Sequence, residues 1–399
     1  MSEPSTVAVT ITGADRPGLT AQLAEAVSQG DAELLDFEQT VVRGQLSIGM
    51  LLSTTTDELD GLGGRLLGMG ESLGLSVRVL PGQGDNPPRH DRAIVTLLGR
   101  PLLASHLAVA ARMIHELGGN IDRARRLSRT PLTSIELWVS PVDAVMLRRV
   151  MAIAGADSGF DVSVSPAGIV RHGRRLVVMD VDSTLIRDEV IELLAAHAGR
   201  GEEVRRITER AMQGDLDFTA SLTERVRALA GLPDTVFAEV LAAVRLTPGA
   251  RTLISTLKEL GLTVGVVSGG FAEVVVPLAE QLGIDYAHAN RLEVVDGQLT
   301  GRIIGDVVDR ATKARKLREW AAAEHLPLSR TIAIGDGAND LDMLAAAGLG
   351  IAFNAKPAVR ASADTSLSLP YLDSVLFLMG LSREEVDDAT ASYHARKQA

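Results

Sequence analysis

The sequence of 399 residues has no cysteine, few aromatic residues and no long apolar run. Without cysteine the chain forms neither disulfide bonds nor thiolate metal sites, which fits a reducing compartment, and we expect a cytoplasmic protein. No apolar stretch approaches the ~18 residues that a membrane-spanning helix needs. The first residues show no basic segment followed by an apolar core, so we expect no secretory signal and no membrane partner.

Charge and aromatic content also restrict the class of partner. The formal net charge is -11 at pH 7, and aromatic residues make up 3% of the chain. An acidic chain repels the phosphate backbone of nucleic acids, and few aromatic rings leave few surfaces on which bases stack. Hydrophobic content of 46% is typical of globular proteins, and the length predicts two or three domains. We therefore expect a small-molecule substrate and no nucleic acid.

Two carboxylates follow a short apolar run. The run, residues 176–179, is typical of a buried parallel strand. Asp180 follows it directly, and Asp182 comes two residues later. In an open α/β sheet, ligands bind in the crevice at the carboxyl ends of the strands. Two acids are costly there unless a cation or a reaction uses them. A helix cap beside a surface aspartate is the alternative at this point.

Two later apolar runs end in polar residues in the same way. Residues 262–267 precede Ser268, Gly269 and Gly270, where a hydroxyl and exposed backbone N–H groups favour an anion site. Residues 331–334 precede a segment that carries Asp336. Lys313 lies between the two runs, at the start of a predicted helix. Each feature alone is typical of a turn, a solvated lysine or a loop, but their order at strand ends favours one shared site.

These motifs resemble those of the haloacid dehalogenase superfamily of phosphohydrolases, and the similarity covers roughly residues 172–399. The matching residues are Asp180 with Asp182 and Thr184, Ser268, Lys313, and Asp336 with Asp340. Within the superfamily, segments 180–190 and 211–225 resemble the phosphoserine phosphatase family. The resemblance implies a Rossmann-like α/β core with a helical cap at about 187–250. It also implies hydrolysis of O-phospho-L-serine, the last step of serine biosynthesis.

The resemblance implies a role for each catalytic residue. Asp180 attacks phosphorus and forms an aspartyl-phosphate, and Asp182 gives a proton to the leaving oxygen and later takes one from water. Mg²⁺ is expected at the carboxylates of Asp180 and Asp336 and the backbone carbonyl of Asp182. Ser268 and Lys313 are expected to hold the phosphate oxygens.

Substrate choice is assigned to the cap and the neighbouring loops. Arg225 is expected to bind the carboxylate of the substrate, and Glu189 its ammonium group. Met212 and Phe218 are expected to shield the reaction from water. In the alternative interpretation the two charged residues lie on a helix surface and the two apolar ones in the core. Further residues assigned to substrate binding are Gly269, Gly270 and Asn339, and Thr184 and Asp340 are expected to support the site from behind.

The N-terminal part contains an internal repeat. Residues 6–80 and 91–165 both predict strand, helix, two strands, helix and strand, and a linker of residues 81–90 separates them. The two copies resemble ACT domains, α+β modules of βαββαβ order that often bind amino acids. The loop with Asp15, Arg16, Gly18 and Leu19 matches the ligand loop of such domains, whereas the second copy keeps only residues 99–101.

The ACT resemblance implies an amino-acid effector, with serine favoured, and a homodimer. The alternative is that both copies serve dimerisation alone. For the whole chain two other functions stay open. One is the same chemistry on another small phosphate, or phosphoryl transfer to an acceptor other than water. The other is an amino-acid-sensing regulator with an inactive phosphatase domain, against which the intact motifs argue.

Overall fold

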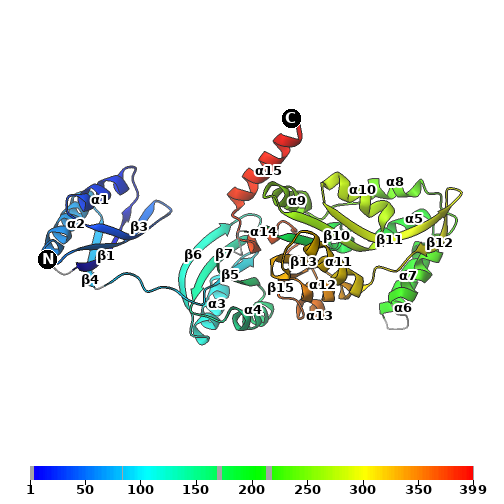
Figure 1. Cartoon of the computed structure of the whole chain (residues 1–399), viewed down its shortest axis with the longest axis horizontal. Coiled ribbons are helices and arrows are strands. Elements are labelled where there is room, and N and C mark those ends of the chain that lie inside the picture. The colour runs from blue at the N-terminus through cyan, green and yellow to red at the C-terminus, as the bar shows by residue number, and fades with distance from the viewer. Residues whose placement is uncertain (1–3, 83, 169–172, 213–217, 399) are drawn as a thin grey trace. The chain divides into compact units, whose positions relative to one another are not determined.

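The structure, a computed structural model, describes residues 4–82, 84–168, 173–212 and 218–398. Within these residues the chain forms three β-sheets (Figure 1). It divides into two compact units, Met1–Pro88 and Arg89–Ala399. Among the described residues no helix is both long and apolar enough to span a membrane.

The first unit is a four-stranded antiparallel sheet with two helices. Its sheet order is β2-β3-β1-β4. Along β1, Val7, Val9 and Ile11 are buried and the residues between them are largely exposed, because one face packs against the helices and the other faces solvent. The elements are β1 (Pro4–Ala14), α1 (Leu19–Ser28), β2 (Glu33–Val42), β3 (Gln45–Thr55), α2 (Leu59–Leu73) and β4 (Ser76–Gly82).

The second unit begins with the same arrangement, but its sheet is covered on both faces. The order is β6-β7-β5-β8, and all residues of β5 are buried. Leu98, Leu127 and Leu132 belong to the hydrophobic core of the C-terminal part of the chain. The elements are β5 (Ala93–Gly99), α3 (Ala104–Glu116), β6 (Asn120–Ser128), β7 (Thr133–Ser140), α4 (Ala144–Ser158) and β8 (Asp161–Pro166). This sheet is therefore packed directly against the rest of the unit.

The rest of the second unit is built on a seven-stranded sheet. Its order is β12-β11-β10-β9-β13-β14-β15, parallel except for the hairpin partner β12. The turn of the hairpin is Asp296-Gly297, and both residues have a positive φ, as a two-residue hairpin turn requires. The strands are β9 (Leu176–Met179), β10 (Thr263–Phe271), β11 (Tyr286–Val295), β12 (Gln298–Ile304), β13 (Thr331–Gly335), β14 (Leu349–Phe353) and β15 (Thr365–Leu367).

Strand β9 lies at the switch point of this sheet. The chain adds β10 and β11 on one side of β9, and β13, β14 and β15 on the other. Helices α9 and α10 cover one face, and α11 and α12 cover the other (Figure 1). The crevice at the carboxyl ends of β9, β10 and β13 is where such sheets bind ligands. The helices of this part are α9 (Ala250–Glu259), α10 (Ala272–Leu282), α11 (Arg310–Ala323), α12 (Leu341–Ala346), α13 (Pro357–Arg360), α14 (Ser374–Leu378) and α15 (Arg383–Gln398).

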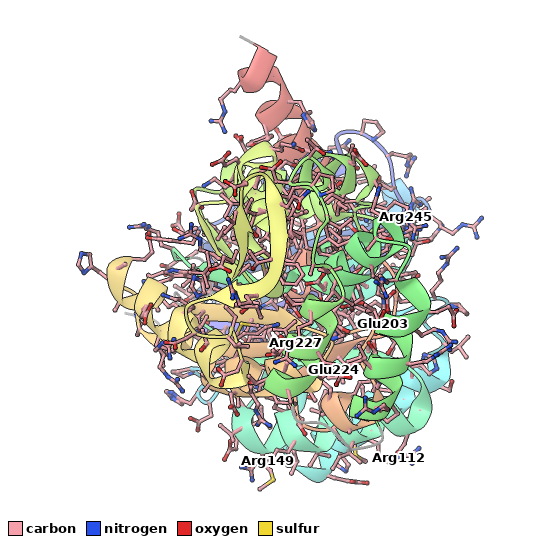
Figure 2. The ribbon with its side chains drawn as sticks, turned by 90° about the vertical axis from the view of Figure 1, so that its right-hand side faces the viewer. Arg112, Arg149, Glu203, Glu224, Arg227 and Arg245 are labelled. Carbon is pink, nitrogen blue, oxygen red and sulfur yellow. The ribbon has the colours of Figure 1, made fainter. Side chains whose placement is uncertain are left out.

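Four helices between β9 and α9 form a cap. They are α5 (Val190–His197), α6 (Gly201–Met212), α7 (Phe218–Arg227) and α8 (Val236–Ala243). Figure 2 looks onto this end of the molecule, with Glu203 on α6 and Glu224 on α7 labelled. The two ends of the cap segment are joined, because Asp188 accepts hydrogen bonds from the backbone N–H of Arg245 at 2.8 Å and from its guanidinium at 2.5 Å. Partial burial would raise the pKa of Asp188, but these hydrogen bonds hold it below its usual value.

Candidate active site

The turn after β9 brings two aspartates to the switch point of the sheet. Asp180 is buried, and its Oδ1 accepts a hydrogen bond from the N–H of Val181 at 2.7 Å. Ser183 has a φ of 57°, in the left-handed region, so the chain turns sharply within three residues. Thr184 then points back and donates a hydrogen bond to Oδ1 of Asp336 at 3.0 Å. The turn thereby ties the end of β9 to the end of β13.

Lys313 forms ion pairs with two of the acids, Asp180 and Asp340. Its Nζ lies 2.8 Å from Oδ2 of Asp180 and 2.7 Å from Oδ1 of Asp340. Burial alone would lower the pKa of Lys313, but the charges of the two carboxylates raise it, so the side chain is an ammonium. Burial raises the pKa of Asp180, and the charge of Asp340 adds to this effect, against the attraction of Lys313. The cluster therefore holds more acid than one lysine compensates.

Three carboxylates could contribute oxygen atoms to a cation. Asp180, Asp336 and Asp340 each present one oxygen, and these atoms lie within 4.8 Å of one another. Burial and the charge of Asp340 raise the pKa of Asp336 to about 6. Asp340 is already engaged, by Lys313 at Oδ1 and by the N–H of Gly337 at Oδ2, 3.0 Å away. Asp180 is engaged in a similar way, by the N–H of Val181 at Oδ1 and by Lys313 at Oδ2, whereas Asp336 accepts from Thr184 at Oδ1. An all-oxygen donor set with excess negative charge fits Mg²⁺.

The side chain of Asp182 points away from that cluster. Its Oδ2 accepts a hydrogen bond from the hydroxyl of Ser268 at 2.7 Å, and its Oδ1 accepts one from the N–H of Val190 at 2.8 Å. The N–H of Gly270 donates in turn to the Ser268 hydroxyl at 2.7 Å. A Cβ at Gly270 would lie 2.7 Å from Oδ2 of Asp182, so this position requires glycine. Asp182 is thus fixed between β10 and the first cap helix.

A cavity of about 490 Å³ lies between these residues and the cap. Its lining includes Glu189 and Arg225 together with Asp180 and Asp182, and Arg225 is the only basic residue in the described lining. Burial and the charge of Asp182 raise the pKa of Glu189 to about 7, although the Ser183 hydroxyl donates to it at 2.8 Å. Burial lowers the pKa of Arg225. The cavity thus places one arginine, Arg225, and two glutamates, Glu189 and Glu192, beside the acid cluster.

Two further sets of predicted site residues belong to the catalytic part of the chain. Gly269, Gly270 and Asn339 line the same cavity. Met212 ends α6 and Phe218 begins α7, but their side chains lie outside the described residues, so their shielding role stays a prediction.

The predicted effector loop belongs to the first unit. Asp15 and Arg16 are exposed, Gly18 precedes α1 with a φ of 89°, and Leu19 is buried in the core of that unit. The guanidinium of Arg16 donates to the backbone carbonyl of Leu73. Leu19 is therefore a packing residue, whereas Asp15 and Arg16 present polar groups at the surface.

The sequence interpretation missed two residues that hold the site together. The hydroxyl of Thr247 donates to the carbonyl of Thr184 at 2.7 Å, and the amide of Asn290 donates to the carbonyl of Gly269 at 2.8 Å. Both are buried. Asn290 gave no clear signal, because its strand also carries His288, Arg291 and Glu293. Thr247 lies in a loop, where a threonine is unremarkable.

Comparison with known families assigns the three parts of the chain. Residues 177–345 match the haloacid dehalogenase-like hydrolase family. Residues 5–80 and residues 92–165 each match an ACT domain family. The catalytic part is therefore that of a hydrolase of the haloacid dehalogenase type, preceded by two ACT domains, and the fold class predicted from the sequence is confirmed.

Similar proteins indicate which family of haloacid dehalogenase-like hydrolases the chain belongs to. The chain is 54% identical to a phosphoserine phosphatase of Streptomyces coelicolor, over 97% of this chain and 95% of the relative. It is 47% identical to a phosphoserine phosphatase of Mycobacterium tuberculosis, over 96% and 95%. The crystal structure of a probable phosphoserine phosphatase from Vibrio cholerae is 33% identical, with a TM-score of 0.57 over 77% of this chain and 89% of that one. A haloacid dehalogenase family hydrolase from Salmonella enterica serovar Typhi is 28% identical, with a TM-score of 0.61 over 72% and 98%. The chain belongs to the phosphoserine phosphatase family.

Proposed function

We propose that the chain hydrolyses O-phospho-L-serine to L-serine and phosphate in a Mg²⁺-dependent reaction, as the last step of serine biosynthesis. One observation carries the proposal. The cavity brings a buried carboxylate beside a lysine together with the guanidinium of Arg225 and the carboxyl group of Glu189. The carboxylate suits attack on phosphorus, and the two charged side chains suit the two charged ends of an amino acid.

In the first step, an oxygen of Asp180 bonds to phosphorus and the bond from phosphorus to the seryl oxygen breaks. A proton on Asp182 passes to that oxygen, because an alkoxide is a poor leaving group. In the second step, water attacks phosphorus, its proton returns to Asp182, and the bond between phosphorus and Asp180 breaks. The hydrogen bond from the N–H of Val190 holds the Asp182 carboxylate in one orientation for both transfers. The Ser268 hydroxyl, which donates to Asp182 in the structure, would turn to the phosphoryl group when substrate binds.

The acids of the site repel the phosphate dianion, so bound cations must offset this repulsion. Asp180 and Asp336 would hold the Mg²⁺, which supplies charge that offsets this repulsion and that of the transition state. Lys313 contributes a second cation at the same carboxylate. The Ser268 hydroxyl and the backbone beside Gly269 and Gly270 would bind the remaining phosphoryl oxygens.

Specificity for phosphoserine would come from Arg225 and Glu189. A guanidinium binds a carboxylate through two parallel hydrogen bonds. Glu189 carries a raised pKa because it is buried near Asp182, although it also attracts Arg225. The ammonium group of the substrate would supply a cation at Glu189 while Arg225 binds the carboxylate. Met212 and Phe218 would close the cavity against water.

The ACT domains would regulate this activity. We expect a homodimer formed through them and a free amino acid, with serine favoured, bound near residues 15–19. Such regulation requires the effector to prefer one arrangement of the domains, with a coupling of typically about 1–3 kcal/mol. Inhibition by serine would then be only partly competitive with phosphoserine.

Phosphate release from a panel of substrates tests the proposal. The panel comprises phosphoserine, phosphothreonine, phosphoethanolamine, which lacks the carboxylate, and p-nitrophenyl phosphate, each with Mg²⁺ and with chelator. We expect kcat/KM to be highest for phosphoserine and activity to require the metal. Equal kcat/KM on all four would overturn the substrate assignment. A chain that releases phosphate from none of them, yet binds serine, would instead be an amino-acid-sensing regulator.

A further inference from the structure

A second cavity lies at the seam between the second ACT domain and the catalytic part. Its volume is about 370 Å³. One wall is formed by α4 and β8, and the other by α13 and β15. It shares no lining residue with the active-site cavity or with the loop of residues 15–19. Volumes of this size are typical of sites for small organic molecules.

The walls are mostly hydrocarbon. Ile153, Phe160 and Val162 line the ACT side, and Pro357 and Ala361 line the catalytic side. Ile153 is 65% exposed, which leaves a large branched side chain in water at the cavity. An aliphatic group placed in the cavity would remove that side chain from solvent.

Three polar groups on the walls have capacity for a ligand. The hydroxyl of Thr365 is buried and has no hydrogen-bond partner in the described part of the chain. Arg360 is half-buried and lies near the carboxylate of Asp161, whose Oδ2 accepts a hydrogen bond from the N–H of Ser368 at 2.8 Å. Asp157 is exposed at the cavity and forms no ion pair with Arg360 among the described residues. The cavity therefore offers a cation, a hydroxyl and an anion that do not satisfy one another.

We propose that this cavity binds a small zwitterion with an aliphatic side chain, an amino acid of the leucine and valine class. Its carboxylate would bind Arg360 and the Thr365 hydroxyl, its ammonium group would face Asp157, and its side chain would pack on Ile153. A phosphate or a simple carboxylate fits less well, because Asp157 repels it and it leaves the apolar walls exposed to water. Serine fits less well because its hydroxyl meets hydrocarbon.

A ligand at this seam would contact both walls at once. The walls are already joined by an ion pair of 3.0 Å between Arg148 and Asp364 and by the Asp161–Ser368 hydrogen bond. A bound molecule that touches both walls stabilises their docked arrangement, because it binds the folded and docked form alone. Binding does not depend on the phosphatase reaction, so it can be tested without turnover.

Calorimetric titration of the full chain with L-leucine tests the site. Two analogues each remove one charged group: 4-methylpentanoate lacks the amine, and 3-methylbutylamine lacks the carboxylate. Titration with leucine in the presence of excess L-serine tests the side chain, because serine is itself expected near residues 15–19 and at the active site. We expect leucine to bind equally well with serine present, and each analogue to bind at least about tenfold more weakly, since a charge-assisted hydrogen bond is lost. No heat from leucine, equal affinity of 4-methylpentanoate, or loss of leucine binding in the presence of serine would overturn the proposal.

Variants locate the binding. Arg360→Met removes the cation at similar length, and Thr365→Val replaces the hydroxyl with a methyl group of the same shape. Arg149→Met is the control, because Arg149 is exposed on the same helix, α4, and does not line the cavity (Figure 2). We expect leucine affinity to fall about tenfold or more in both cavity variants, with phosphate release unchanged, and to stay unchanged in the control. Wild-type affinity in both cavity variants would place leucine elsewhere and overturn the site.

Discussion

The ammonium group of Lys313 lies 2.8 Å from Oδ2 of Asp180, with both side chains buried. The contact joins α11 to the end of β9 and turns one carboxylate oxygen of Asp180 toward the lysine. The same lysine binds Asp340, whose other oxygen holds the N–H of Gly337. One cation therefore orders the proposed nucleophile and the loop after β13, so its loss would affect both activity and stability.

We predict that Lys313→Met abolishes phosphate release and lowers the free energy of unfolding by about 3–5 kcal/mol, because it leaves two buried carboxylates without their partner. Urea unfolding measures the stability. Lys316→Met is the matched control on the same helix, since Lys316 forms an ion pair with Glu319 near the surface. Equal stability of the two variants would show that the buried contact contributes little.

Replacing the two aspartates separates their roles. Asp180→Asn removes the nucleophile and is expected to end turnover with the fold intact, because an amide does not attack phosphorus. Asp182→Asn is expected to lower kcat by about 10²–10⁴-fold through lost proton transfer. Steady-state kinetics on phosphoserine with circular dichroism as the folding check measures both. Substantial turnover by the Asp180 variant would exclude the covalent mechanism.

Arg225→Ala tests recognition of the substrate carboxylate. A charge-assisted contact contributes about 1.5–3 kcal/mol, so kcat/KM for phosphoserine is expected to fall about ten- to a hundredfold. The loss on phosphoethanolamine should be small. Arg227→Ala is the control, because Arg227 is exposed on the same helix (Figure 2). If kcat/KM falls equally for both substrates in the Arg225 variant, that side chain binds the phosphate or stabilises the fold instead.

Metal removal tests the oxygen cluster. Chelation is expected to stop phosphate release and Mg²⁺ to restore it, and Mg²⁺ should raise the melting temperature of the wild type, since a ligand of the folded state stabilises it. Asp336→Asn is expected to need a higher Mg²⁺ concentration for both effects, because it loses one anionic ligand. A variant with wild-type Mg²⁺ dependence would remove Asp336 from the metal site.

Two N-terminal truncations are expected to behave differently. Removing residues 1–88 deletes a unit with its own core, so folding and phosphate release should persist. Removing residues 1–171 also uncovers the core that Leu98, Leu127 and Leu132 help to form, and each buried leucine contributes about 1.5–3 kcal/mol. Thermal unfolding of the two fragments measures the difference. Equal melting temperatures would show that the second ACT domain is not needed for stability.

Much of the candidate site could be predicted because it lies at strand ends. Apolar runs that stop at Asp180, Ser268 and Asp336 are local signals, and parallel strands bring their carboxyl ends to one edge of the sheet. Lys313 was found by its position between two such runs. The contact of Asp182 with the N–H of Val190 was not predictable, because it depends on where the cap docks.

The features that the sequence did not reveal depend on long-range packing. Strand β5 is buried along its whole length, and the layer that covers its second face comes from residues distant in the sequence. Thr247 supports the carbonyl of Thr184 across 63 residues of sequence. The seam cavity likewise joins residues of two domains, so no local motif marks it.

The most direct test of the account is to find the phosphoryl group during turnover. The enzyme is mixed with phosphoserine and Mg²⁺, quenched in acid within the first turnover, and digested for mass spectrometry. The account predicts one added phosphoryl group on the peptide that contains Asp180, and none in the Asp180→Asn variant. Phosphate released at the wild-type rate without any phosphorylated peptide, or a phosphoryl group on another residue, would contradict it.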